Sequence, residues 1–327
     1  MTGQAKTATK IIGHEPILAF LEHSANAGRL AHAYLFAGPE HVGKMAVARE
    51  FTHSLFPGVA DLATHPDFAV IERERDAKTG KLHGSIILEQ IHALTGRLSL
   101  GAFIGGYKDC IIDGAETMTT EAANSLLKTL EEPRPKTILI LLANSEAEVL
   151  PTIRSRCQII RVGRVSTEAI VSALVARGVT QGKALLYAGL SGGLPGKAIA
   201  YSENPNSLDE MFALRDTVLG FSRLPVAQRW SAIDKLLPAK MPFQEAGDKA
   251  RLVIDLVAEI VRDALLVASG VSASPTHTDL AVILSSWASE VGQAKLANIA
   301  DLTCSSRKLL DSNVNPRTVL ERLALSF

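Results

Sequence analysis

The strongest constraint on the fold is a series of short apolar runs separated by segments with helical spacing. The runs that suit buried strands are Ala33–Ala37, Phe68–Ile71, Cys110–Ile112, Thr137–Leu142 and Gln158–Val162. The segments with helical spacing are Glu15–Ala27, Lys44–Leu55, Ile86–Leu98 and Thr120–Glu131. Unbroken apolar strands that alternate with helices are typical of a parallel sheet covered on both faces. The first half of the chain is therefore predicted to be an α/β domain.

The second half carries no strand signal and is predicted to be all-α. Residues 167–202 should form short helices around the glycine-rich turn Ser191–Gly196, and from about Leu208 the chain should be helical to its end. Arg251–Ala268 shows the expected pattern, with charged residues on one face and aliphatic residues on the other. A chain of 327 residues is too long for one compact domain. We expect three domains, at 1–163, 164–205 and 206–327.

Charge and cysteine usage narrow the function classes. Basic and acidic residues balance at 34 each, which argues against a protein that holds DNA alone through a broad basic face. The three cysteines form no CxxC pair, so a disulfide framework or cysteine-rich zinc site is not expected, and a reducing cytosol fits. The longest apolar run, Ile138–Ala143, is far shorter than the ~20 residues that span a bilayer. We expect a cytoplasmic protein without a membrane segment.

A candidate phosphate loop follows the first predicted strand. Gly38-Pro-Glu-His-Val-Gly43-Lys44 has the G-x4-G-K spacing and opens a helix. In such loops the glycines let backbone N–H groups surround a phosphate, and the lysine reaches the outer phosphates. The next position normally carries a Ser or Thr hydroxyl that holds Mg²⁺, but here it is Met45, whose thioether is a poor ligand for a hard cation. The loop either binds nucleotide without hydrolysing it or is retained for its fold alone.

A second motif bears on the same question. Asp113 ends the apolar run that begins at Cys110, where a carboxylate would help to hold the metal. In active phosphate-loop ATPases with such an aspartate, the next residue is normally a glutamate that orients the attacking water, whereas here it is Gly114. Glu116 lies two residues further along and is not expected to take that place. The losses at Met45 and Gly114 together predict that the chain does not hydrolyse ATP.

Several longer motifs resemble one known family. The segments are IIGHEPI (11–17), HAYLFAGP (32–39), AANSLLKTLEEP (122–133) and TIRSRC (152–157). Together they resemble the bacterial clamp-loader subunits of DNA polymerase III, which are AAA+ proteins. The resemblance is strong over about 11–163 and extends further only through general layout and Asn315-Pro-Arg317. It implies an AAA+ P-loop domain, a small helical lid domain and a helical C-terminal collar domain.

The departures from the family pattern select a branch of it. Losses such as those at Met45 and Gly114 are typical of the delta-prime branch, whereas the gamma/tau motor subunits keep both motifs. Many relatives also carry a four-cysteine zinc module, but Phe51–Glu89 contains no cysteine, so we expect no zinc. The resemblance implies gamma/tau and delta subunits as partners, and the sliding β clamp and primed DNA through the complex.

The resemblance also implies roles for individual residues. Arg156, in Ser155-Arg156-Cys157, would reach the ATP of an adjacent subunit as an arginine finger; the alternative is an ordinary surface arginine. Asn144 occupies the sensor 1 position, although a turn or cap role is favoured for it. ATP or ADP, if bound without hydrolysis, would contact Gly38, Gly43, Lys44, Asp113 and Asn144.

Three functions therefore stay open at this point. The favoured one is a non-hydrolysing clamp-loader subunit that acts through Arg156. A motor ATPase would need Mg²⁺ held through Asp113 despite Met45, and a regulator would bind nucleotide without cleaving it. Lys197, near the sensor 2 region, suits either that role or a solvated turn. Trp230 and Trp287 suit either the core of the C-terminal domain or a collar interface.

Overall fold

The computed structural model describes residues 11–75, 83–104, 106–270, 276–312 and 314–327. The chain forms two compact units. The first contains the chain up to Ala184 together with Gly193–Ala198, and the second contains Leu185–Gly192 and Ile199–Phe327. The division between the two units falls within the segment predicted to be the lid. The three domain boundaries given above stay a prediction.

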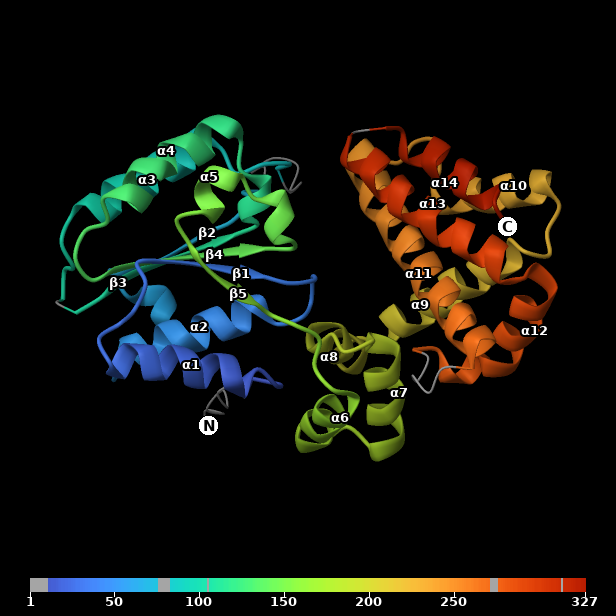
Figure 1. Ribbon diagram of the computed structural model, residues 1–327, viewed down its shortest axis with the longest axis horizontal. Helices are drawn as coiled ribbons and strands as arrows, with labels where there is room; N and C mark the ends of the chain where they lie inside the picture. Colours follow the sequence, from blue (N-terminus) through green and yellow to red (C-terminus); the bar gives the residue numbers. More distant parts are fainter. Residues whose placement is uncertain (1–10, 76–82, 105, 271–275, 313) are drawn as a thin grey trace, which may run out of the picture. The chain divides into compact units, whose positions relative to one another are not determined.

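The first unit is built on a five-stranded parallel sheet (Figure 1). Its strands are β1 (Ala33–Ala37), β2 (Phe68–Ile71), β3 (Lys108–Asp113), β4 (Thr137–Ala143) and β5 (Gln158–Arg161), in the order β2-β3-β4-β1-β5. In the register, Leu35 of β1 lies between Leu141 of β4 and Ile159 of β5. All five predicted strands are confirmed, with ends shifted by at most two residues. The order sets β1 beside β4, so the loops that follow these two strands meet.

Helices cover both faces of this sheet, as Figure 1 shows. On one face lie α1 (Glu15–Asn26) and α2 (Lys44–Leu55), and on the other lie α3 (Leu88–Ser99) and α4 (Thr120–Glu131). Alternate residues of β1 serve the two cores: Tyr34 and Phe36 pack with α1 and α2, and Leu35 packs with α3 and α4. The four predicted helices are thus confirmed, and with them the α/β class of this half.

Further short helices lie between the strands of the sheet and on both sides of the glycine-rich turn. They are η1 (Leu62–Thr64), η2 (Ala115–Thr117), η3 (Glu146–Glu148), α5 (Pro151–Arg154), α6 (Thr167–Ala176), α7 (Gln181–Ser191) and α8 (Pro195–Glu203). At the start of α8, the N–H of Gly196 donates to the carbonyl oxygen of His41 at 2.9 Å. The turn therefore lies directly against the phosphate loop.

The second unit is helical, as predicted. After the end of α8 it contains α9 (Pro205–Gly220), α10 (Val226–Leu236), α11 (Phe243–Ser269), η4 (Thr278–Leu280), α12 (Ala281–Val291), α13 (Gln293–Asp311) and α14 (Pro316–Ala324). The predicted apolar face of α11 supplies much of its core. Trp287 is buried and stacks on Phe327, with ring centroids 5.7 Å apart. Trp230 is 45% exposed, so the core interpretation holds for Trp287 only.

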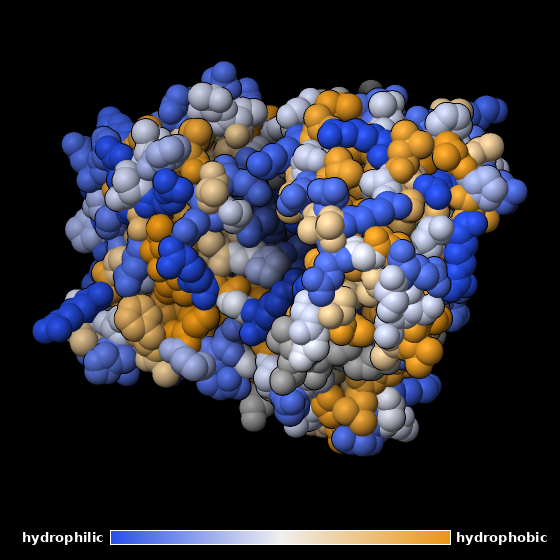
Figure 2. Space-filling model, turned by 45° about the vertical axis from the view of Figure 1, so that its right-hand side comes forward, coloured by the Kyte–Doolittle hydropathy of each residue, from blue (hydrophilic) through white to orange (hydrophobic). Residues whose placement is uncertain are grey.

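Figure 2 shows the distribution of hydrophilic and hydrophobic side chains on one face of the molecule. On the face drawn in Figure 2, hydrophilic and hydrophobic residues are interleaved. Among the helices of the described residues, none combines the length and the apolar character needed to cross a membrane.

Candidate functional site

The phosphate loop has the predicted position between β1 and α2. The N–H of Gly38 donates to Ala143 at the end of β4, at 3.1 Å. A Cβ atom on Gly38 would lie only 2.1 Å from the carbonyl oxygen of Val162, so this position accepts only glycine. Gly43 has a φ of 107° and forms the N-cap of α2. The strand–loop–helix arrangement expected of a nucleotide-binding loop is therefore present.

Lys44 folds back onto its own loop. Its Nζ atom donates to the carbonyl oxygens of Gly38 at 2.6 Å and Pro39 at 3.0 Å, and to Oδ1 of Asn144 at 3.0 Å. An ammonium group has three N–H donors, and all three are used here. The residue is only 9% exposed, and burial lowers the pKa of Lys44 against the opposing charges of Glu116 and Asp113. A phosphate would gain a hydrogen bond from Lys44 only by displacing one of these acceptors.

Asn144 contacts the loop rather than capping a helix. Its side chain accepts the hydrogen bond from Lys44, and its N–H donates to Oε1 of Glu116 at 3.2 Å. A turn or cap role was favoured for Asn144, and the cap of η3 is made by Ser145, whose hydroxyl accepts from the N–H of Ala147. The Asn144 side chain thus holds Lys44 and does not cap η3. The structure brings Asn144 to Lys44, as a sensor position would require.

Glu116 is closer to the loop than its sequence position suggested. Gly114 adopts a φ of 84°, and η2 follows it directly, so the chain turns back at the end of β3. This turn brings the Glu116 carboxylate to Asn144, and its charge is the largest opposing influence on the pKa of Lys44. Its Oε2 atom is buried and has no hydrogen-bond partner among the described residues. The site thus carries an acid that the motif comparison left out.

The residues expected near a metal do not suit Mg²⁺. The Met45 side chain packs against the core between the sheet and α1 and α2, and its thioether is a poor ligand for a hard cation. Asp113 is half-buried at the end of β3; burial raises its pKa, and Lys44 opposes that rise. Within the described ranges, no three His, Cys, Asp or Glu side chains are grouped as a metal site. We derive no hydrolytic step from this site.

Arg156 lies between α5 and β5, and it has a partner. Its NH2 atom donates to Oε1 of Glu131 at 2.7 Å, and its NH1 atom donates to the carbonyl oxygen of Thr152 at 2.8 Å. The Arg156 side chain is 35% exposed and that of Glu131 is 50% exposed. Arg156 therefore has hydrogen-bond acceptors within its own chain. To act as an arginine finger, Arg156 would first have to release Glu131 and then contact a phosphate of the neighbouring subunit.

The neighbouring Cys157 packs against the core. It is half-buried against the core beside α3 and α4, and burial raises the pKa of its thiol to about 12. The reactive form of cysteine is the thiolate, which such a pKa keeps unpopulated near neutral pH. The structure therefore supports a packing role for Cys157.

His14 is a further residue that sequence reasoning did not assign to the loop. Its Nε2 atom lies 2.9 Å from the carbonyl oxygen of Val42, which precedes Gly43. Neither His14 nor Glu116 could be assigned by motif spacing, because each reaches the loop through tertiary packing. Lys197 lies in α8, one residue after the Gly196 contact with the phosphate loop.

Comparison with known proteins agrees with this architecture. Residues 13–166 match the family described as DNA polymerase III, delta subunit. DNA polymerase III subunit delta' of Bacillus subtilis is 28% identical over 94% of this chain and 94% of its own length. The corresponding subunit of Pseudomonas aeruginosa is 37% identical over 39% of this chain and 42% of its own length. The chain is therefore similar to delta' subunits of DNA polymerase III, and in the Bacillus subtilis case this similarity extends over nearly its whole length.

The fold is that of the AAA+ proteins. A solved structure, a DNA polymerase III gamma subunit-related protein from Thermotoga maritima, covers 95% of this chain and 97% of its own with a TM-score of 0.53. The two sequences are 17% identical, so this likeness concerns the fold alone.

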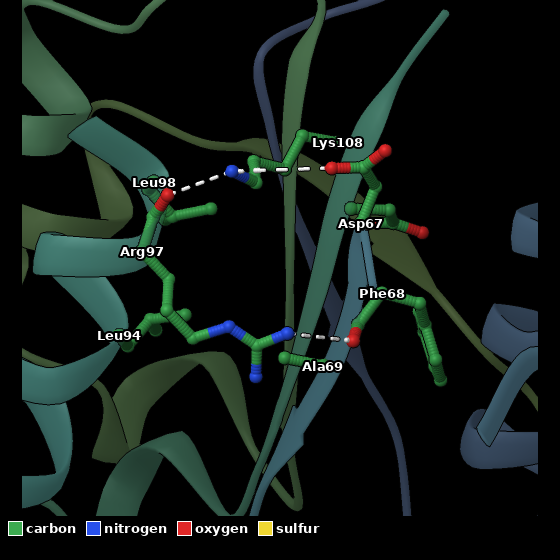
Figure 3. A pocket seen from close by; sticks show the side chains of 8 residues that line it. Asp67, Phe68, Ala69, Leu94, Arg97, Leu98 and Lys108 are labelled. Atoms are coloured by element: carbon green, nitrogen blue, oxygen red, sulfur yellow. Dashed lines mark hydrogen bonds and ion pairs between the residues drawn. The ribbon is translucent and has the colours of Figure 1, made fainter. Parts of the chain in front are cut away.

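A second polar cluster in the first unit lies between β2, β3 and α3 (Figure 3). Lys108 donates to the carbonyl oxygen of Arg97 at 2.8 Å and lies 4.0 Å from Asp67, and Arg97 donates to the carbonyl oxygen of Phe68 at 3.2 Å. Asp67 also accepts from the N–H groups of Phe103 and Ile104. The cavity beside them measures about 10 Å³, which holds at most one water molecule. This cluster fixes the loop before β3 and is too small to bind a nucleotide.

Proposed function

We propose that this chain is a non-hydrolysing clamp-loader subunit of the delta-prime kind, which supplies Arg156 to the ATP site of a neighbouring subunit. The observation that carries the proposal is the use of all three Lys44 donors by Gly38, Pro39 and Asn144. Binding the outer phosphates would break contacts that are already made. Met45 and Gly114 remove the usual metal ligand and base as well.

The proposal includes a place for the subunit in an assembly. It would act in the cytoplasm with gamma/tau and delta subunits, on the sliding β clamp and primed DNA. The balanced charge supports DNA contact through the complex rather than by this chain alone. Trp230, Val226 and Phe243 are exposed apolar residues beyond the core of the second unit, and they support a collar role for it.

The trans role of Arg156 is tested in a reconstituted loader. Arg156→Ala should reduce hydrolysis at the adjacent site by about a thousandfold, the lower end of the effect of arginine fingers in GTPases. The measurement is clamp- and DNA-stimulated ATPase, with assembly checked by gel filtration. Arg177→Ala, which removes an exposed arginine after α6, is the matched control. An intact loader that keeps its full rate without Arg156 would refute the trans role.

One observation favours a second candidate, a subunit that binds nucleotide without cleaving it. The loop retains its shape, and Lys44 and Asn144, the two polar side chains expected near the outer phosphates, lie 3.0 Å apart. Equilibrium binding of a fluorescent ATP analogue to the isolated chain separates the two. If the main proposal is correct, the isolated chain shows no ATP-analogue binding that depends on Lys44, so Lys44→Ala leaves the binding signal unchanged. Steady-state hydrolysis by the isolated chain, abolished by Lys44→Ala, would instead indicate a motor ATPase.

A further inference from the structure

The guanidinium group of Arg156 is held by acceptors from two different elements. Thr152 of α5 accepts from NH1 at 2.8 Å through its backbone carbonyl, and the Ser155 hydroxyl lies 3.3 Å from the same atom. Glu131, the last residue of α4, accepts from NH2 at 2.7 Å. The first two contacts belong to the turn that carries Arg156 itself. The third comes from 25 residues earlier in the chain and is the only one of these three with a full charge.

The position of Glu131 is electrostatically unfavourable without a cation beside it. It ends a helix of 12 residues, where the unpaired carbonyl groups already give a partial negative charge. Glu132, at the C-cap of the same helix, adds a second carboxylate. Arg156 is the cation that pairs with Glu131, so the two side chains stabilise each other's placement. Both are partly exposed, and solvent keeps such a pair weak and reversible.

We propose that Glu131 is a competing acceptor for Arg156 and occupies, in the free subunit, the edge of the guanidinium that a phosphate takes after assembly. The inference rests on the proposed trans role of Arg156. Carboxylate and phosphate oxygens accept the same pair of parallel N–H donors, so one can replace the other. A terminal phosphate carries more negative charge than a carboxylate and displaces Glu131. The Thr152 carbonyl contact can persist through this exchange, because it uses NH1.

The test compares five versions of the chain in a reconstituted loader: wild type, Glu131→Gln, Glu132→Gln, Arg156→Ala, and the double variant Glu131→Gln/Arg156→Ala. The readouts are the maximal rate and the half-saturating ATP concentration at several salt concentrations. Removing the competing charge of Glu131 should lower the half-saturating concentration by up to about fivefold, the range of an exposed ion pair. The effect should shrink as salt rises, because salt screens the pair in the wild type.

The control variants separate this effect from a general change of charge. Glu132→Gln removes the same charge one residue away and should leave the half-saturating concentration unchanged. Glu131→Gln should have no effect when Arg156 is already replaced by alanine. Equal behaviour of Glu131→Gln and Glu132→Gln would overturn the role of Glu131, and so would a raised half-saturating concentration in Glu131→Gln. If Arg156→Ala itself has no effect, the trans role fails instead, so the two failures are distinguishable.

Discussion

Asp109 is a buried acid that ties the helix after the phosphate loop to the strand that ends at Asp113. It lies in β3, and its Oδ2 atom accepts a hydrogen bond from the hydroxyl of Thr52 in α2. Its Oδ1 atom is buried and has no hydrogen-bond partner among the described residues. Burial raises the pKa of Asp109 to about 7, although Thr52 and the N–H of Cys110 oppose the rise. Replacing this residue by asparagine tests the consequence for stability.

The sign and size of the effect follow from the two pKa values. The carboxyl group titrates near 3.8 when the chain is unfolded and near 7 when it is folded. Between these values the folded state keeps a proton that the unfolded state has released, so the free energy of unfolding falls as pH rises. The gap of about three pH units corresponds to about 4 kcal/mol. Stability from this group is complete below about pH 4, is lost progressively as pH rises from there to about 7, and changes little above that.

Asp109→Asn removes the titration while its amide oxygen can still accept from Thr52. We expect the variant to gain stability relative to wild type as pH rises, by about 2 kcal/mol or more between pH 5 and pH 8. Both tryptophans, Trp230 and Trp287, lie in the second unit, so their fluorescence does not follow this site. Hydrogen exchange of the β3 amides during urea unfolding, with intrinsic rates corrected for pH, is the suitable assay.

A matched control is Glu50→Gln, which neutralises an exposed acid on the same helix as Thr52. It should show the same pH profile as the wild type. Parallel profiles for wild type and Asp109→Asn would refute the reasoning, because they would mean that Asp109 binds its proton equally well in the folded and unfolded states.

Two further predictions concern close packing and a buried charge. Gly38→Ala should destabilise the first unit by about 1–3 kcal/mol, because its Cβ atom would meet the Val162 carbonyl. The control Gly96→Ala lies at an open position in α3 and should stabilise the unit by up to about 1 kcal/mol. Thermal unfolding followed by circular dichroism measures both changes. Asp263→Asn should cost about 3 kcal/mol or more in urea unfolding followed by tryptophan fluorescence, because it breaks a fully buried acceptor site. The control Asp255→Asn breaks an exposed pair on the same helix and should cost less than about 1 kcal/mol; equal losses would contradict the burial argument.

Regular elements were predictable where the local pattern was strong. The bounds of Lys44–Leu55 and Thr120–Glu131 agree with α2 and α4, because apolar periodicity and the Thr119 cap are local signals. Trp230 shows the limit of this reasoning: helical spacing fitted either a core or an interface residue, and only the packing of the unit leaves its side chain 45% exposed. Asp263 shows the converse, since a charged residue in the apolar pattern is buried against His277.

The candidate site also has features that could be predicted from the sequence and features that could not. The absence of a hydroxyl group at Met45 and of a carboxylate at Gly114 can be read from residue identity, since no fold restores a side-chain group that the residue lacks. The partners of Lys44 and Arg156 could not be read in this way. Asn144 lies 100 residues from Lys44 in the chain, and they meet because β1 and β4 are neighbours in the sheet.

The sequence by itself thus determined which elements form and which chemical groups the loop lacks, because both depend on local pattern and residue type. Only the tertiary structure shows that all three Lys44 donors have acceptors, that the Glu116 carboxylate accepts from Asn144 beside the loop, and that Glu131 pairs with Arg156. These contacts depend on the order of the strands and on a left-handed turn at Gly114. Contacts of that kind are set by the packing of distant segments, and no local pattern encodes them.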